Sequence, residues 1–187
     1  MNSRLNYLIV HGTYGYPEEN WFPWLKNKLS ANANVVVPKF PTPEGQTLAS
    51  WLTIADAAIK NWTPDSTVLI GHSAGAVLVL RMAEKAKKPF RAVYPVCPFA
   101  QPLNLPQFDP LLSSFVEPPF DWQAVQRGAK TITCFAGDDD PYVPLGYSDK
   151  VARPAGAALI VIKKGGHLNE AAGYLEFPRL LEEIIQA

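Results

Sequence analysis

The sequence predicts one α/β domain, with a compact, mostly parallel sheet of about six strands and helices on both faces. Three observations predict this fold. The chain has 187 residues, a usual length for one domain. Short apolar runs rich in Val and Ile recur along it, which suits strands buried on both faces. Segments with helical patterning separate most of these runs, and such alternation is typical of a parallel sheet.

Six apolar runs are the expected strands. They are Tyr7–Val10, Val35–Pro38, Thr67–Ile70, Arg91–Val96, Thr131–Phe135 and Ala158–Ile162. In a sheet of this kind, functional sites form at the carboxyl ends of the strands. We therefore expect the chemistry of this protein just after residues 10, 70, 96, 135 and 162.

Four segments carry the apolar spacing of helices. The clearest stripe runs from Leu48 to Ile59, and a weaker one begins at Trp21. The segment Ala76–Ala83 is apolar almost all round, so it predicts a central, buried helix. A last stripe begins at Phe177, where Pro178 suits the first helical turn because its missing N–H costs nothing there.

Residues 100–128 interrupt this alternation with several prolines and with Phe108, Phe115, Phe120 and Trp122. The stretch is too long for an ordinary connection and too aromatic for a disordered linker. Two interpretations remain open. One is a small excursion packed over the edge or mouth of the sheet, and the other is a purely structural loop. Either way, we expect residues 1–187 to form a single domain.

Composition excludes several classes of function. Lys plus Arg equals Asp plus Glu at 17 each, whereas nucleic-acid binders usually carry a basic excess. No apolar run approaches the roughly 20 residues of a membrane span, and the N-terminal residues lack a signal-peptide pattern. We expect a cytoplasmic protein without a nucleic-acid or membrane partner. Cys97 and Cys134 stand in apolar stretches and are predicted to be small buried side chains.

Residues 71–75, Gly-His-Ser-Ala-Gly, match the G-x-S-x-G pattern between an expected strand and an expected helix. In that context the pattern predicts a nucleophile elbow, a sharp turn that projects Ser73 above the sheet. The helix that follows adds free N–H groups and a positive dipole end, which suit a developing oxyanion. A tight turn with only a packing role is the alternative interpretation.

A serine hydroxyl is a weak nucleophile without a base. His167 follows the last expected strand on a glycine-rich loop and is the candidate base. His72 is adjacent to Ser73, and neighbours in a turn generally point apart. His11 follows the first strand and is expected to support a turn.

The base needs a carboxylate to fix its tautomer. Asp138, Asp139 and Asp140 follow the fifth expected strand. The spacing Gly-x-x-Asp-x-x-Val-Pro favours Asp140 over Asp139, which leaves the other two as turn or solvent residues. The order Ser73, Asp140, His167 is that of α/β-hydrolases.

Two backbone N–H groups are expected to form an oxyanion hole, one from Ala74 and one from Thr13 in the loop after the first strand. Aromatic side chains near these positions either line an apolar substrate pocket or belong to the core. They are Tyr14, Tyr16, Trp21 and Phe99, together with the aromatics of the excursion. The sequence has no dinucleotide or phosphate-loop motif, and its three histidines lack metal-ligand spacing. We expect neither a cofactor nor a metal.

Taken together, the HGT loop, the Trp-rich first helix, GHSAG, GDDDPYVP and GGHLNE resemble the small α/β-hydrolase family of YdeN-type serine hydrolases. The resemblance spans nearly the whole chain. It implies a compact sheet without the two leading strands of larger α/β-hydrolases, Ser73, Asp140 and His167 as a triad, and cleavage of esters or small amides. The L-x-C-x-E sequence of the family's retinoblastoma-binding member is absent, so that partner is not implied and any protein partner remains unknown.

The sequence therefore predicts a serine hydrolase that cleaves small carboxylic esters or amides through an acyl-enzyme on Ser73. A non-catalytic interaction module on a hydrolase fold is one alternative, because fold does not guarantee chemistry. An acyltransferase or amidase with the same three residues is another.

Overall fold

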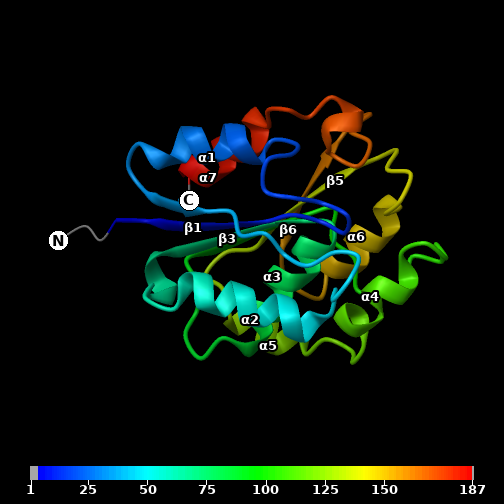
Figure 1. Cartoon of the computed structure of the whole chain (residues 1–187), viewed down its shortest axis with the longest axis horizontal. Coiled ribbons are helices and arrows are strands. Elements are labelled where there is room, and N and C mark those ends of the chain that lie inside the picture. Colours follow the sequence, from blue (N-terminus) through cyan, green and yellow to red (C-terminus); the bar gives the residue numbers. More distant parts are fainter. Residues whose placement is uncertain (1–3, 187) are drawn as a thin grey trace.

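Six parallel strands form one sheet in the order β2-β1-β3-β4-β5-β6 (Figure 1). The structure is a computed structural model that describes residues 4–186. The strands are β1 Asn6–Val10, β2 Asn34–Val36, β3 Thr67–His72, β4 Ala92–Val96, β5 Thr133–Gly137 and β6 Ala158–Ile162. Every neighbouring pair is parallel. All six expected strands are therefore confirmed, with shifts of a few residues at their ends.

Two layers of helices cover the sheet. The helices are α1 Phe22–Ser30, α2 Leu48–Ile59, α3 Ala74–Lys85, α4 Asp109–Val116, α5 Trp122–Arg127, α6 Leu145–Ala152 and α7 Pro178–Gln186, with short 3-10 turns at Pro64–Ser66 (η1) and Glu170–Ala172 (η2). Helices α1 and α7 lie together on one face, and α2, α3 and α5 lie on the other (Figure 1). The expected single α/β domain with helices on both faces is confirmed.

Alternate residues of each strand serve two separate cores, which explains the continuous apolar runs. In β1, Tyr7 and Ile9 pack with the side chains of α1 and α7. Leu8 and Val10 face the opposite way and pack with Trp51 of α2 and the buried side chains of α3. Both faces of the central strands are therefore closed to solvent.

Helix α3 is the central helix, as its all-round apolar pattern predicts, and every residue from Ala74 to Ala83 is buried. The one charged residue in that stretch is Arg81. Its Nε donates to the Phe115 carbonyl at 3.0 Å, its Nη1 pairs with Glu84 at 2.8 Å, and its guanidinium stacks over Phe120 at 3.5 Å. The buried guanidinium thus ties the 100–128 segment to the middle of the fold.

The two interpretations of residues 100–128 each describe part of that segment. Leu103, Phe108 and Leu112 face a cavity at the mouth of the sheet, whereas Phe115 and Val125 are buried against α3 and serve the core. The apolar and aromatic side chains of this segment therefore serve two purposes: some line the cavity and others pack in the core.

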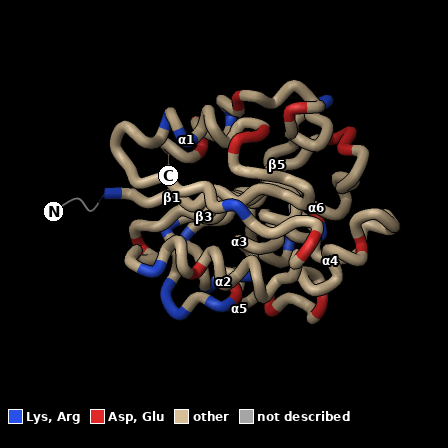
Figure 2. The backbone as a smooth tube through the Cα atoms, viewed as in Figure 1, with Lys and Arg blue, Asp and Glu red and all other residues tan. Residues whose placement is uncertain are grey.

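Lys and Arg are interspersed with Asp and Glu along the backbone in both helical layers (Figure 2). Cys97 and Cys134 are both free and buried, as expected. Within residues 4–186, no helix has the length and apolar character needed to cross a bilayer.

Candidate active site

The carboxyl ends of the strands meet at one edge of the sheet. Val10 of β1 pairs in register with Gly71 of β3, and Gly137 of β5 pairs with Ile162 of β6. Parallel pairing therefore brings the loops after β1, β3, β4, β5 and β6 together, where the sequence predicts the chemistry.

Ser73 stands in the sharp turn between β3 and α3, with φ 56° and ψ −118°. A non-glycine residue with positive φ is strained and persists only where its surroundings hold it. Gly71 and Gly75 make this turn possible, because a Cβ on Gly71 would collide with the Gly75 backbone and a Cβ on Gly75 would lie 2.6 Å from the His11 carbonyl oxygen. Within residues 4–186, the Ser73 hydroxyl has no hydrogen-bond partner, so it is open to the cavity in front of it.

Asp140 and His167 form a buried pair, with 2.7 Å between Asp140 Oδ2 and His167 Nδ1. The other carboxylate oxygen of Asp140 accepts from the amides of Tyr142 and Val143 at 2.8 and 3.0 Å. Burial raises the pKa of Asp140, but its contact with His167 and these two amides outweigh burial and hold the pKa below its ordinary value. The ionised carboxylate keeps the proton of His167 on Nδ1 and leaves Nε2 free to accept one.

Asp138 and Asp139 also bind the loop that carries His167. Asp138 Oδ1 accepts from the Lys164 amide at 2.6 Å, and Asp139 Oδ1 accepts from the Gly166 amide at 2.7 Å. Both are exposed residues of a turn, as expected. Their side chains in addition tether the loop after β6 to the loop after β5. All three acids of the run hold one short segment.

The backbone carbonyl of His167 is held from the opposite side. His72 Nε2 donates to it at 2.8 Å, and Cys97 Sγ lies 3.5 Å from it. Burial, reinforced by the nearby His167, lowers the pKa of His72 to about 3, so the ring is neutral with its proton on Nε2. In the sequence, His72 stood out only because it is adjacent to Ser73. Its hydrogen bond to the His167 carbonyl became visible only in the fold.

His11 braces the loop after β1. Its Nδ1 donates to the Gly12 carbonyl at 2.8 Å, and its Nε2 accepts from the Phe40 amide at 3.0 Å. Both ring nitrogens of this buried histidine are therefore used, in agreement with the expected supporting role.

Thr13 and Ala74 flank Ser73 from two elements. Gly12 lies against Ser73, since a Cβ on Gly12 would be 3.1 Å from the Ser73 Cβ. Thr13 follows Gly12 and lines the cavity, and its hydroxyl accepts from Gln46 Nε2 at 2.9 Å. Ala74 is the first residue of α3, so its N–H has no acceptor within the helix.

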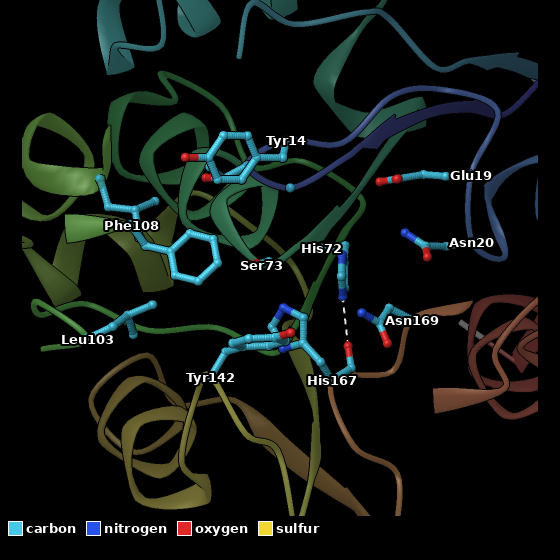
Figure 3. A pocket seen from close by; sticks show the side chains of 13 residues that line it. Tyr14, Glu19, Asn20, His72, Ser73, Leu103, Phe108, Tyr142, His167 and Asn169 are labelled. Carbon is cyan, nitrogen blue, oxygen red and sulfur yellow. Dashed lines mark hydrogen bonds between the residues drawn. The ribbon is translucent and has the colours of Figure 1, made fainter. Parts of the chain in front are cut away.

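A cavity of about 260 Å³ opens over Ser73 and His167, and its two sides differ in chemistry (Figure 3). Apolar and aromatic side chains line one side, and polar side chains line the other. The first group is Tyr14, Leu103, Phe108, Leu112 and Tyr142, and the second is Glu19, Asn20, His72 and Asn169. Ser73 lies between the two groups in Figure 3, so a ligand bound over it would contact both.

The family model described as "Serine hydrolase" matches residues 7–186. The chain belongs to this serine hydrolase family. It is 31% identical to the putative hydrolase YdeN of Bacillus subtilis, over 91% of this chain and 89% of YdeN. It is 24% identical to the serine hydrolase RBBP9 of Rattus norvegicus, over 98% and 96% of the two chains.

The crystal structure of the B. subtilis ydeN product superposes on this serine hydrolase with a TM-score of 0.89, at 28% identity and 97% coverage of both chains. A putative bromoperoxidase, BpoC from Mycobacterium tuberculosis, superposes with a TM-score of 0.72 at 13% identity, a likeness of fold. The expected resemblance to YdeN-type serine hydrolases and the α/β-hydrolase fold are both confirmed.

The candidate pocket residues of this serine hydrolase separate into three groups. Tyr14 lines the cavity, where its ring lies 5.9 Å from that of Phe108. Tyr16 is exposed away from the lining. Trp21 and Phe99 are fully buried in the two cores, so neither is available to a substrate. Trp21 instead donates from Nε1 to the Leu168 carbonyl at 2.9 Å, which makes it another support of the His167 loop.

The lining residues that the sequence analysis did not single out come mostly from loops far apart in the chain. They are Glu19, Asn20, Leu103, Leu112, Tyr142 and Asn169. Two of them had a local signal, since Tyr142 stands two residues after Asp140 in the GDDDPYVP motif and Asn169 stands two residues after His167 in the GGHLNE motif.

Donor atoms of His72, Cys97 and His167 lie within 4.8 Å of one another, a separation that would admit a metal ion. Each of these side chains already makes a hydrogen bond. Burial and the neighbouring Asp140 also raise the pKa of the Cys97 thiol, which opposes the thiolate that a metal would need. The group does not fit a resident metal.

Proposed function

We propose that this serine hydrolase cleaves small carboxylic esters or amides through an acyl-enzyme on Ser73. The observation that carries the proposal is the ionised Asp140 bonded to His167 Nδ1, over a cavity shared with the strained, unbonded Ser73. A serine that faces a cavity together with an oriented imidazole is the pairing of nucleophile and base on which nucleophilic catalysis relies.

In the first half-reaction, His167 Nε2 takes the Ser73 proton while Ser73 Oγ attacks the substrate carbonyl carbon. The carbonyl oxygen becomes an oxyanion, stabilised by the N–H groups of Ala74 and Thr13. The bond from carbon to the leaving group then breaks, and His167 returns the proton to the departing alcohol or amine. Asp140 orients the imidazole and stabilises its charged form.

In the second half-reaction, water replaces the leaving group. His167 takes a proton from the water as its oxygen attacks the acyl carbon. The bond between that carbon and Ser73 Oγ breaks, and the proton passes back to Ser73. The products are a carboxylic acid and the unmodified protein.

The test is intact-mass analysis after treatment with a fluorophosphonate, which phosphonylates an activated serine and releases fluoride. We expect one adduct on the wild type and none on Ser73→Ala. Ser113→Ala is the matched control, because Ser113 is an exposed helix serine outside the cavity, and it should keep the adduct.

A correctly folded wild type without an adduct would contradict the proposal and favour the non-catalytic alternative. Where the adduct forms, short acyl esters are assayed with and without an added alcohol. Release of free acid as the main product supports hydrolysis, and transfer of the acyl group to the alcohol supports the acyltransferase alternative.

A further inference from the structure

The polar side of the cavity carries one carboxylate, Glu19, whose side chain extends toward the cavity in Figure 3. It lies in the loop between β1 and α1. Gly15 makes room for it, because a Cβ at that position would collide with Glu19 Oε1. The carboxylate is therefore packed onto the same loop that presents Thr13.

The described residues give Glu19 no cationic partner. No salt bridge within residues 4–186 includes it, and the cavity lining contains neither lysine nor arginine. His72, also in the lining, is neutral because burial lowers its pKa to about 3. Apart from His167, the described lining residues therefore offer no group that could compensate the charge of Glu19.

The surroundings of Glu19 add to this negative potential. Burial has the largest effect and raises its pKa, the hydrogen bond with the Tyr16 backbone partly opposes this, and the charge of Glu170 raises the pKa further, against a smaller opposing effect of Asn20. Asn20 Oδ1 accepts from the Glu170 amide at 2.8 Å, which fixes the second acid beside the polar side. Burial and the charge of Glu170 both disfavour the ionised carboxylate of Glu19, and a nearby positive charge would offset both effects.

A neutral or anionic ligand on this side would remove water from Glu19 and leave its charge unpaired, which is costly. A protonated amine would supply N–H donors and the missing positive charge, and charge-assisted hydrogen bonds are among the strongest available. The opposite side of the cavity is apolar and has no such preference.

We propose that this enzyme selects substrates that carry a protonated amine, held by Glu19 on the polar side of the cavity while an apolar group fills the side lined by Phe108 and Leu112. The inference rests on the proposed function for the bond that reacts. The amine belongs either to the acyl part or to the leaving group, and the experiment separates these two cases.

The kinetic test uses two matched pairs of esters. Leucine methyl ester and methyl isocaproate differ by an amine on the acyl part, and dimethylaminopropyl butanoate and isohexyl butanoate differ by an amine on the leaving group. For at least one pair, we expect the cationic ester to have a kcat/KM at least about tenfold higher than that of its neutral partner. A factor of this size corresponds to one hydrogen bond to a charged group. The pair that responds identifies the part of the substrate beside Glu19.

Glu19→Gln should lower that ratio about tenfold, because the amide keeps the shape and loses the charge. Glu18→Gln is the matched control: Glu18 is the exposed neighbouring acid outside the lining, so the ratio should stay as in the wild type. Circular dichroism confirms the fold of each variant. A wild-type ratio near one for both pairs, or a ratio that survives Glu19→Gln, would overturn the proposal.

A binding measurement keeps the inference separate from catalysis. Leucinamide and isocaproamide are titrated calorimetrically into Ser73→Ala protein, with and without Glu19→Gln. If the leucine ester pair is the one that responds, we expect leucinamide to bind about tenfold more tightly than isocaproamide and to lose that advantage with Glu19→Gln. Equal affinity for the two amides, together with no preference among the leaving-group esters, overturns the amine site. Absence of a fluorophosphonate adduct overturns the proposed function instead.

Discussion

Asp139 Oδ1 accepts a 2.7 Å hydrogen bond from the amide of Gly166, the residue just before His167. The contact joins the loop after β5 to the loop after β6. With the contacts of Asp138 to the Lys164 amide and of Asp140 to His167 itself, three consecutive carboxylates hold the loop of the candidate base at three residues. The loop that carries the imidazole is thus held by acids that lie outside the cavity lining.

Asp139→Ala should lower kcat on the order of tenfold with little change in KM, because a misplaced base costs rate more than binding. Asp139→Asn should restore most of the rate, since its side-chain oxygen still accepts from Gly166. Steady-state kinetics with a short acyl ester and thermal unfolding of each variant check this. Equal kinetics for the Ala and Asn variants would show that the hydrogen bond does not position His167.

Asp140→Asn should lower kcat on the order of 10⁴-fold, because a neutral amide neither fixes the His167 tautomer nor stabilises the imidazolium. Asp138→Asn makes the same chemical change two residues away and keeps its acceptor oxygen, so it should cost far less. The comparison uses kcat for both variants at neutral pH. A loss below tenfold for Asp140→Asn would remove Asp140 from its proposed role.

His72 should make the protein less stable in mild acid. The unfolded chain takes up a proton on this side chain near its ordinary pKa of 6.5, whereas the folded protein resists protonation until about 3. The free energy of unfolding therefore falls as the pH decreases through that window. At about pH 5 the loss from His72 should reach about 2 kcal/mol.

Urea unfolding of the wild type and of His72→Gln at pH about 7 and about 5 measures this effect. The variant should lose about 2 kcal/mol less than the wild type between these values. His11, whose pKa burial also lowers, is unchanged in the variant and acts equally in both proteins. The pKa of Asp140 is held below its ordinary 3.8, so its contribution is still present at pH 5. Identical losses in both proteins would refute the assignment to His72.

Phe108→Ala should shift the acyl preference toward longer chains, because removing this ring enlarges the apolar side of the cavity. The kcat/KM for a hexanoyl ester divided by that for an acetyl ester should rise about tenfold. Discrimination of this size is usual when an apolar pocket gains or loses room for methylene groups of the substrate. Phe120→Ala is the control, since Phe120 stacks on Trp122 at 4.7 Å and lies outside the lining. A rise of the same size in both variants would point to general loosening rather than to the cavity.

The three candidate catalytic residues and the strands that they follow could be predicted because short local patterns mark each of them. Ser73 lies within five residues that contain both glycines of the turn, flanked by a strand and a helix. Asp140 and His167 each follow a strand directly, and parallel pairing then brings both to the same edge as Ser73. No long-range information was needed beyond the rule that the strands are parallel.

The sequence left open which aromatic residues line the cavity and which belong to the core, and the reason is physical. Trp21 and Phe99 are near the site in the sequence, but burial depends on which face of the sheet a side chain meets after folding, and both meet a core. Glu19 and Phe108 enter the cavity from loops whose spacing carries no periodic signal.

By itself, the sequence determined the six-stranded α/β architecture, the turn at Ser73 and the acids and histidines that follow the strands, since these depend on short patterns. Only the tertiary structure decided that Asp138, Asp139 and His72 hold the His167 loop, and that Glu19 faces the cavity. Those contacts join loops from different strands, and their geometry exists only once the strand ends have been brought together.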